Sequence, residues 1–534
     1  MNEKFALWTV LLRQYLKRDW RKIVIWVLGL GLFASAYVPA FKEIAKGSGL
    51  PTMYTTMKNP AMISIVGPTP IKNAADYTIG AMYGQEMLLF CGLFAMIVAA
   101  LHVVGHTRKE EDFGLTELVQ SFRVGRQANS LAVIVETIFI NLLLALLTAG
   151  VMVSFRVASI SLPGALLFGG ALGLAGILGA ALALLFAQIM PTSGGASGAT
   201  LGLVGLLYVV RAGTDVSNVT WSWFNPLGWL YLTFPFTDNN WAPLVYGLLV
   251  SLVLVVVAFV LEGRRDVGVG YLPERAGRAT AKSGLLSVPG LFLRLNRGTI
   301  ISWMVALVLL GMAYGSIYGD MQSFLESNAL MKQMFAATHT SIEASFTSTI
   351  IVVLVDLAAI LPIAIVNKLF TEETRLHLSQ LYVTKVSRRK LYWTNVSLAL
   401  VAGVLGVALA AGSLGATALA AIGATSKMTL FDFLAAGFSG WPVVLFVTGL
   451  AALALGWAPR LGKIAYLYLG YSFALNYFGG ILNLPDWFTK TAVQTWLPRL
   501  PVAQFNGPTF ATITVLGIVL LVLGDLGYQR RDLI

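Results

Sequence analysis

Three carboxylic acids stand inside long apolar segments, where an ionisable group can hold a proton or line a polar path. They are Glu86, Glu136 and Asp356, and Asp356 lies deepest in its segment. A charge left in lipid costs at least about 2.5 kcal/mol, so each acid should face a cavity or a neighbouring helix. We predict that all three line a translocation path. A hydrogen bond between helices is the alternative, and Glu86 and Glu136 lie near enough to span ends to reach the interface.

Few other residues offer reactive chemistry. The single cysteine, Cys91, has no partner for a disulfide, and the four histidines show no metal-ligand spacing. His102 and His106 are four residues apart and share a helix face, most simply as a polar helix end. The phosphate-binding motif G-x-x-x-x-G-K-[ST] is absent. We therefore expect no catalytic residue, metal or cofactor in this chain, and a membrane-embedded enzyme is disfavoured.

The sharpest pattern lies in two charged segments that each follow an apolar stretch. We call Lys109–Gln127 the first inner loop and Glu372–Lys390 the second. Each begins with acids, ends with bases and carries apolar residues at helical spacing, a polarity that suits the helix dipole. The key acids and apolar residues are Glu110, Glu111, Leu115, Leu118, Val119 and Phe122 in the first loop, and Glu373, Leu378, Leu381 and Tyr382 in the second.

Two interpretations of these loops remain open. The predicted helices, Glu110–Phe122 and Glu373–Lys385, can rest on the lipid surface or dock into a groove on a cytosolic partner. Two similar loops favour docking, because a partner with two-fold symmetry needs two such contacts. We predict that both loops contact a partner.

These residues belong to a chain dominated by apolar stretches. Of its 534 residues, 57% are hydrophobic and 12% are charged, against about 25% charged in soluble domains. A stretch of about 20 apolar residues spans a bilayer. Glycines at 169–181 and 193–202 should let helices approach closely. We predict an all-α polytopic membrane protein with about twelve spans, at 22–41, 82–104, 129–155, 164–190, 197–213, 241–262, 298–319, 346–369, 391–423, 431–458, 463–483 and 508–527.

The distribution of Lys and Arg predicts the orientation. Most of the 37 lie on the side of the N-terminus, including the clusters at 13–22 and 388–390. Because cytoplasmic loops are the positively charged ones, both termini should be cytosolic. The net charge of +12 thereby points to the lipid bilayer and not to nucleic acid.

The two halves of the chain repeat one another. Arg-Arg-Asp follows an apolar stretch at 264–266 and again at 530–532. A shift of 263 residues pairs Glu110 with Glu373 and Leu115 with Leu378. We predict two tandem six-span halves, 1–262 and 298–534, joined by a basic cytosolic linker at 263–297. Each Arg-Arg pair should anchor its helix at the inner headgroups.

Amphipathic segments flank the spans on both sides. Lys4–Lys22 has the pattern of an interfacial helix lying on the membrane before the first span, and 287–298 is a shorter version. On the outer side, Val219–Phe236 and its counterpart Leu484–Phe505 are aromatic and interrupted by proline. We predict that both dip into the outer leaflet as short re-entrant helices, with a plain aromatic belt as the alternative. The residues expected there are Trp223, Asn225, Pro226 and Trp229.

Together these features resemble the permease of a bacterial ATP-binding-cassette (ABC) type-2 exporter. The resemblance rests on the duplicated six spans, the acidic-start inner loops, "WFNPLGW" at Trp223–Trp229 and the terminal "RRDLI". These motifs are similar to those of fused twelve-span permeases of antibiotic exporters, often for polyketides, of the tetronasin-resistance type. The second half departs from this pattern, because no "NPLGW" follows Asp486-Trp487-Phe488.

The resemblance implies partners and a direction of transport. A separate cytosolic ABC ATPase, present in two copies, would bind ATP and Mg²⁺ and move the inner loops as coupling helices. A hydrophobic drug or antibiotic would then leave across the bacterial cell membrane, along a path between the halves. The alternative is a proton-coupled secondary multidrug transporter, which the three acids in the spans favour. The loop "GHTRKEEDFGLTEL" does not resemble the motif usual in the major facilitator family.

Overall fold

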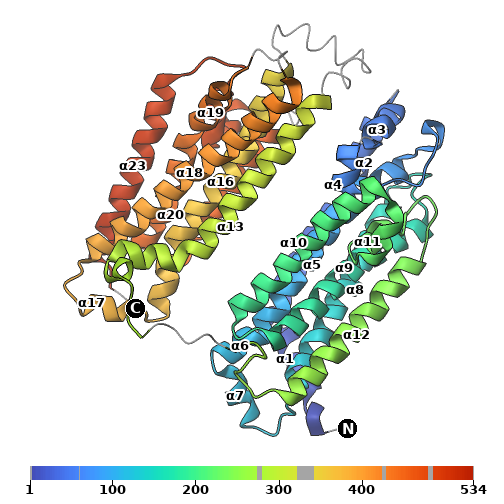
Figure 1. Ribbon diagram of the computed structural model, residues 1–534, viewed down its shortest axis with the longest axis horizontal. Helices are drawn as coiled ribbons and strands as arrows, with labels where there is room; N and C mark the ends of the chain where they lie inside the picture. The colour runs from blue at the N-terminus through green and yellow to red at the C-terminus, as the bar shows by residue number, and fades with distance from the viewer. Residues whose placement is uncertain are drawn as a thin grey trace. The chain divides into compact units, whose positions relative to one another are not determined.

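The computed structural model describes residues 3–47, 49–58, 60–273, 279–320, 342–423, 428–478 and 485–532, and every regular element within them is helical (Figure 1). In this described part, 11 helical segments are long and apolar enough to cross a membrane. The predicted all-α polytopic membrane fold is thereby confirmed. The chain divides into two compact units, Met1–Gly277 and Arg278–Ile534.

The first unit is built from six long helices and several short ones. The short 3-10 turns are η1 (Glu3–Phe5), η2 (Ala74–Asp76) and η3 (Val219–Phe224). The helices are α1 (Trp8–Ser35), α2 (Val38–Ile44), α3 (Gly49–Met57), α4 (Pro60–Val66), α5 (Ile79–His106), α6 (Arg108–Asp112), α7 (Leu115–Gln120), α8 (Ala128–Ser154), α9 (Leu162–Ile189), α10 (Ser193–Ser217), α11 (Gly228–Tyr231) and α12 (Ala242–Arg264).

The second unit has the same order of long helices. Its 3-10 turns are η4 (Ser283–Leu286), η5 (Ile317–Asp320), η7 (Pro459–Leu461) and η8 (Val493–Trp496). Its helices are α13 (Val288–Ser316), α16 (Ile342–Thr374), α17 (Ser379–Tyr382), α18 (Arg388–Ile422), α19 (Leu430–Ser439), α20 (Trp441–Trp457), α21 (Ile464–Phe478), α22 (Asp486–Thr489) and α23 (Gly507–Arg530).

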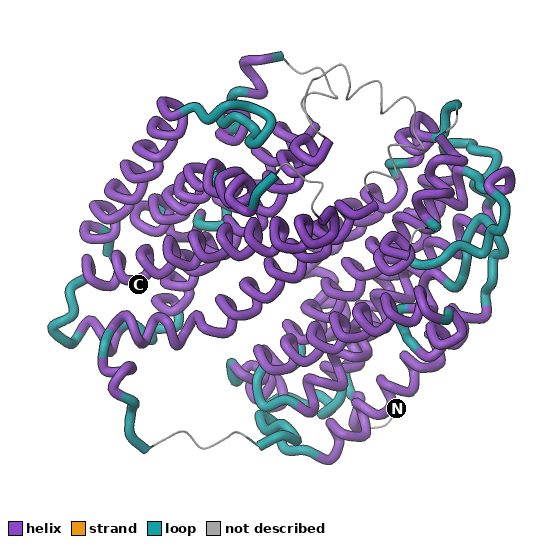
Figure 2. The backbone as a smooth tube through the Cα atoms, turned by 45° about the horizontal axis from the view of Figure 1, so that its top comes forward, coloured by secondary structure: helices purple, strands orange, loops and turns teal. Residues whose placement is uncertain are grey.

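The same three helix pairings recur in the two units. In the first, α1 packs on α8, α5 on α9, and α9 on α12. In the second, α13 packs on α18, α16 on α20, and α20 on α23. The tube view in Figure 2 shows each unit as a bundle of long helices. These three pairs of helices therefore have equivalent neighbours in the two units.

The segment before each first span is continuous with the helix of that span. α1 runs without a break from Trp8 to Ser35, and α13 begins at Val288 and continues to Ser316. Tyr15 and Asp19 of the predicted interfacial part are buried against the first unit's other helices. The position of these segments at the membrane surface stays a prediction.

Two later spans differ from the expected segments. The predicted tenth span consists of α19 and α20, which break at Gly440 just before Pro442, a residue that cannot donate a helical hydrogen bond. Within the predicted eleventh span, α21 covers Ile464–Phe478, and residues 479–484 lie outside the described residues. The count of twelve spans stays a prediction.

One of the two glycine-rich stretches packs as expected. A Cβ atom at Gly169 of α9 would lie 2.3 Å from the carbonyl oxygen of Ala145 on α8, and one at Gly179 would lie 2.4 Å from that of Met96 on α5. By contrast, Gly198 and Gly202 of α10 have no neighbour within 4 Å of a built Cβ. The expectation of close packing is therefore correct for α9 and wrong for α10.

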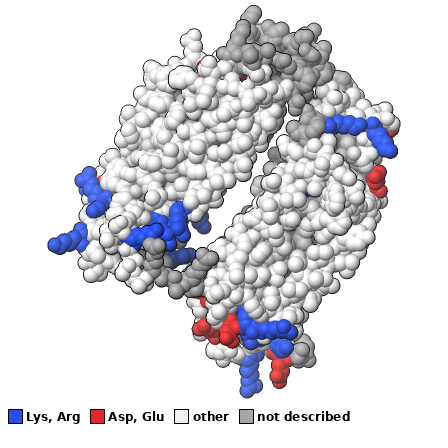
Figure 3. Space-filling model, viewed as in Figure 1, with Lys and Arg blue, Asp and Glu red and all other residues white. Residues whose placement is uncertain are grey.

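Charged side chains lie at the ends of the helices. Figure 3 shows Lys, Arg, Asp and Glu at the ends of each unit, with uncharged sides between them. In the first unit one end joins three segments: Gly125 and Gln127 donate backbone hydrogen bonds to the N-terminal segment, and Phe5 contacts Phe259 of α12. The N-terminus, the first inner loop and the end of α12 therefore share one end of this unit.

Candidate functional site

The first inner loop is not one helix. It folds as α6 and α7, separated at Gly114, whose φ of 70° lies in the left-handed region. Glycine adopts this conformation at little cost, so the chain turns there and the predicted stripe is divided. Phe113, Leu115, Leu118 and Phe122 remain exposed, and Val119 is half-buried. The loop thus presents a patch of large apolar side chains at the end of the unit.

A buried ion pair fixes this loop to the last helix of its unit. Arg265, the second arginine of Arg-Arg-Asp, donates from Nη1 and Nη2 to the two carboxylate oxygens of Glu111, at 2.9 and 2.5 Å. Its Nε donates to Gln188 of α9 at 2.7 Å. Arg108 adds a third donor to Glu111 at 2.8 Å. We call the two-pronged Arg265–Glu111 pair the first clasp. The two parallel hydrogen bonds of such a forked pair hold the side chains in one relative orientation, in addition to the attraction between their charges.

The second unit has the same clasp. Arg531 donates from both terminal nitrogens to the two oxygens of Glu373, one of these bonds being 2.8 Å long. Its guanidinium also lies 4.9 Å from the ring centre of Tyr528 on α23. The neighbouring arginines, Arg264 and Arg530, are exposed. In each Arg-Arg pair, therefore, only the first is free to meet lipid headgroups, and the second holds the inner loop, contrary to our expectation that both anchor the helix.

The clasps correct the register of the repeat. Glu111 and Glu373 are equivalent, which requires a shift of 262 residues and not 263. The same shift pairs Gly114 with Leu376, whose φ of 61° is also left-handed. It further pairs buried Thr116 with buried Leu378. The sequence pairing of Glu110 with Glu373 is wrong by one residue, because charge alone does not show which acid meets the arginine.

In the corrected register, the side chains that the second loop exposes differ from those that the sequence predicted. Leu378 is buried in the core of its unit, and Leu381 and Tyr382 pack against that core. Tyr382 shares a hydrogen bond with the hydroxyl of Tyr528 at 2.9 Å, and burial raises the pKa of the Tyr382 phenol above its usual value. The exposed apolar residues are instead Leu376 and Val383. The second loop therefore offers a smaller apolar patch than the first.

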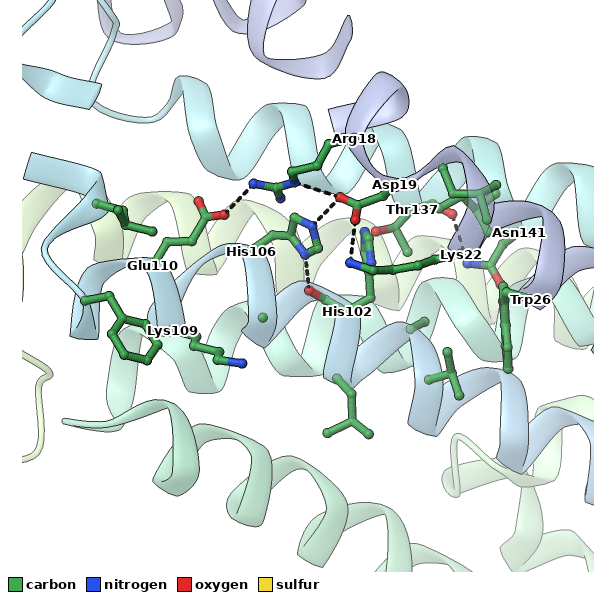
Figure 4. Close-up of a pocket in the computed structure, with 18 residues that line it drawn as sticks. Arg18, Asp19, Lys22, Trp26, His102, His106, Lys109, Glu110, Thr137 and Asn141 are labelled. Carbon is green, nitrogen blue, oxygen red and sulfur yellow. Dashed lines mark hydrogen bonds and ion pairs between the residues drawn. The ribbon is translucent and has the colours of Figure 1, made fainter. Parts of the chain in front are cut away.

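A polar cluster that the sequence did not predict lies beside the first loop. Figure 4 shows Arg18, Lys22 and His106 converging on the buried carboxylate of Asp19, at 3.0, 2.6 and 2.8 Å. Glu110 accepts from Arg18 at 3.2 Å. The cluster joins the N-terminal half of α1 to the C-terminal end of α5 and to α6. The sequence indicated this cluster only through the four-residue spacing of His102 and His106. It did not indicate their partners on α1 and α8.

The three acids in the spans have different surroundings. Glu136 is fully buried, with one oxygen 3.2 Å from His102 Nε2, so it does not reach the interface as considered above. Asp356 accepts a hydrogen bond from the Gln494 amide and lies in a small recess of the second unit. Glu86 has one buried oxygen without a partner among the described residues. The structure does not bring these acids together within either unit.

The outer segment of the first unit is buried within it. Asn225, Trp229 and Tyr231 are buried, while Trp223 and Pro226 are half-buried. α11 packs on α5, α9 and α12, so the irregular backbone is covered by protein, as membrane depth requires. Asp215 of α10 holds the segment by accepting from Tyr231 and Ser222, and fully buried Arg211 pairs with Asp215 at 2.8 Å.

The second unit keeps one feature of this segment without the "NPLGW" motif. The indole of Trp229 donates to the carbonyl of Trp223 at 2.7 Å, and that of Trp496 donates to Lys490 at 2.8 Å. In both cases the acceptor lies six residues earlier. The two outer segments therefore share a local turn, although their sequences differ.

Comparison with known proteins shows that the chain is similar in sequence to a transporter. Residues 285–529 match the family described as "Multidrug efflux system permease Rv1217c, C-terminal domain". Over 536 residues, the chain is 27% identical to the multidrug efflux system permease protein Rv1217c of Mycobacterium tuberculosis (strain ATCC 25618 / H37Rv), a match that covers 98% of this chain and 94% of that protein. This polytopic α-helical chain is therefore similar, along nearly its whole length, to a multidrug efflux permease.

Proposed function

We propose that this chain is the permease subunit of an ABC exporter that removes hydrophobic drugs or antibiotics, polyketides among them, across the bacterial cell membrane. The name of its relative and the many membrane-spanning helices support efflux. The chain has no phosphate-binding motif, so ATP and Mg²⁺ would bind to a separate cytosolic ATPase, in two copies. Both termini would be cytosolic.

The observation that carries this proposal is the pair of clasps. Each inner loop is tied by a forked, buried ion pair to the residue directly after the last long helix of its unit, α12 or α23. A partner that moves the loop therefore also moves the end of that helix, since stretching a buried pair is costly. Two loops with the same attachment suit a partner with two equivalent grooves.

The exposed apolar side chains of the loops would provide the contact. Leu118 and Phe122 are 63% and 70% exposed in the first loop. In the second loop the exposed apolar side chains are Leu376 and Val383, at other positions of the repeat. Because the first patch is larger, we expect it to contribute more of the binding energy than the second.

The test is substrate-stimulated ATP hydrolysis by the chain reconstituted with a candidate ABC ATPase from the same organism. The variant is Leu118→Ala with Phe122→Ala. Truncation of a buried interface anchor commonly costs about 2 kcal/mol or more, roughly 30-fold in affinity. We expect the stimulation to be lost, while the isolated ATPase keeps its basal rate.

A matched control uses Trp221→Ala with Phe224→Ala, which removes aromatic side chains that are 61% and 78% exposed in η3, away from the inner loop. This control should couple normally. If the loop variant stimulates hydrolysis as well as the wild type does, the loop is a lipid-surface segment and the proposal fails.

A proton-coupled secondary transporter is the second candidate. It is favoured by the buried carboxyl of Glu136 beside His102 and by Asp356. Such a carrier would move substrate in proteoliposomes that contain this chain alone, driven by a pH gradient. The exporter proposal expects no transport under those conditions until the ATPase and ATP are added.

A further inference from the structure

A cavity of about 520 Å³ opens beside the polar cluster of the first unit (Figure 4). Its walls come from α1, α5, α8 and the first inner loop, and all lining residues belong to this unit. Cavities of roughly 300–1,000 Å³ hold drug-sized molecules. The size of the cavity therefore suits a small organic ligand.

The walls divide into an apolar part and a charged part. Ile23 and Trp26 of α1, Leu101 of α5 and Ile140 of α8 form the apolar part. The charged part lies beside the first inner loop and contains Arg18, Asp19, Lys22, His106, Lys109 and Glu110. A ligand that fills the cavity must therefore combine an apolar body with a polar head.

Positive groups outnumber negative ones in the charged part. His106 Nδ1 faces the carbonyl oxygen of His102 at 2.9 Å, and Nε2 faces Asp19 at 2.8 Å. Asp19 also accepts from Arg18 and Lys22, so its carboxylate is already paired within the cluster. Lys109 has no ion-pair partner in the described part of the chain. The three cations Arg18, Lys22 and Lys109 thus face the two carboxylates of Asp19 and Glu110.

We propose that this cavity binds an amphiphilic organic anion. Its acidic head would lie between Lys22 and Lys109, and its apolar body would lie along Trp26 and Ile140. This proposal rests on the proposed function and narrows it to a substrate class. The shared chemistry is an anionic head on an apolar body, whether the molecule is a free carboxylic acid or an anionic lipid of the inner leaflet.

The cavity also contacts the first inner loop. Phe113 and Leu115 line it, and both belong to the exposed apolar patch of that loop. A bound ligand would therefore touch the segment that we propose to dock the ATPase. This shared wall gives a direct route by which an occupied cavity can alter coupling.

Binding can be measured without the ATPase. The full chain in phosphatidylcholine nanodiscs would be titrated with radiolabelled dodecanoate, and with dodecyltrimethylammonium as the cationic counterpart, after subtraction of empty nanodiscs. We expect saturable binding of dodecanoate, at least about tenfold tighter than that of the cation, a difference of about 1.4 kcal/mol. Equal or tighter binding of the cation would overturn the proposal.

Two matched pairs of variants locate the site. Gly105 lines the cavity and has no neighbour within 4 Å of a built Cβ, as is also true of Gly150, which lies outside the lining. Gly105→Leu should fill the cavity and abolish saturable binding, whereas Gly150→Leu should bind as the wild type does. Lys109→Gln should weaken binding about fivefold. Lys46→Gln, which removes an exposed lysine outside the lining, should not.

The outcomes also separate the two sources of the ligand. Phosphatidylglycerol in the nanodisc should compete with dodecanoate if a lipid headgroup occupies the site, and should leave binding unchanged if only free acids enter. Unaltered binding in Gly105→Leu would overturn the proposal in either case. If binding behaves as expected but no ATP-driven export is found, the site stands and the exporter proposal fails.

Discussion

Neighbouring arginines have opposite roles at the end of each unit. Arg264 is exposed and Arg265 is buried on Glu111, while Arg530 is exposed and Arg531 is half-buried on Glu373. Removal of one partner from a buried ion pair leaves the other charge without compensation. The clasps therefore offer a comparison in which two adjacent arginines should respond very differently to the same substitution.

Arg265→Ala should destabilise the first unit by about 3–5 kcal/mol, because Glu111 would keep only Arg108 as an ionic partner. Arg264→Ala should change stability by no more than about 0.5 kcal/mol. Thermal unfolding of the purified full chain, followed by size-exclusion chromatography after heating, measures both. Similar melting curves for the two variants would show that the clasp does not hold the loop.

The role of Asp356 is separable by two substitutions. Asp356→Asn keeps an oxygen that can accept the hydrogen bond from the Gln494 amide, whereas Asp356→Leu removes it. We expect normal expression of both, reduced efflux with leucine and nearly normal efflux with asparagine in a drug-accumulation assay. Loss of efflux in both variants would instead indicate that the ionisable group carries protons, and would favour the secondary transporter.

At the scale of helices, close packing in the second unit depends on glycines. A Cβ at Gly456 of α20 would lie 2.2 Å from the carbonyl oxygen of Gly524 on α23, and one at Gly449 would lie 2.9 Å from that of Gly517. At each of these two contacts, glycines let the backbones of α20 and α23 approach closely. Such close packing is a main source of helix association in lipid.

Gly456→Leu should therefore force α20 and α23 apart. Overpacking typically costs about 1–3 kcal/mol, and more where a backbone atom is the obstacle. The yield of monodisperse protein and its melting temperature should both fall. Gly470→Leu on α21, where a built Cβ has no neighbour within 4 Å, is the control and should behave as the wild type does. A stable Gly456→Leu would mean that this pair of helices tolerates a wider spacing.

At the scale of the whole molecule, the prediction concerns topology. The N-terminus, the first inner loop and the end of α12 are held together at one end of the first unit, so they must share one side of the membrane. Six spans in each half would return the chain to that side. A reporter fused after Ile534, which lies outside the described residues, should therefore read cytosolic. An extracellular reading would mean that the α21 region does not cross the membrane.

The sequence by itself determined the class of protein and most of its helices. Apolar stretches such as 164–190 and 241–262 predicted α9 and α12 closely, because hydropathy is a local property that lipid selects directly. The two Arg-Arg-Asp motifs also predicted a duplication, and recurring helix pairings agree with it. The two inner loops contain short helices, which the sequence predicted to be continuous.

Only the tertiary structure decided which charges meet. Arg265 and Glu111 are 154 residues apart, and Glu110 was an equally good partner by charge. Asp19, His102, His106 and Glu136 come together from α1, α5 and α8. The physical reason is that a contact between two helices depends on how each helix is rotated about its axis and on how closely glycines let the two backbones approach. The hydropathy of a single segment contains neither quantity. A one-residue change of register turns a helical side chain by about 100°, and this decides whether Leu378 lies in the core or on a docking surface.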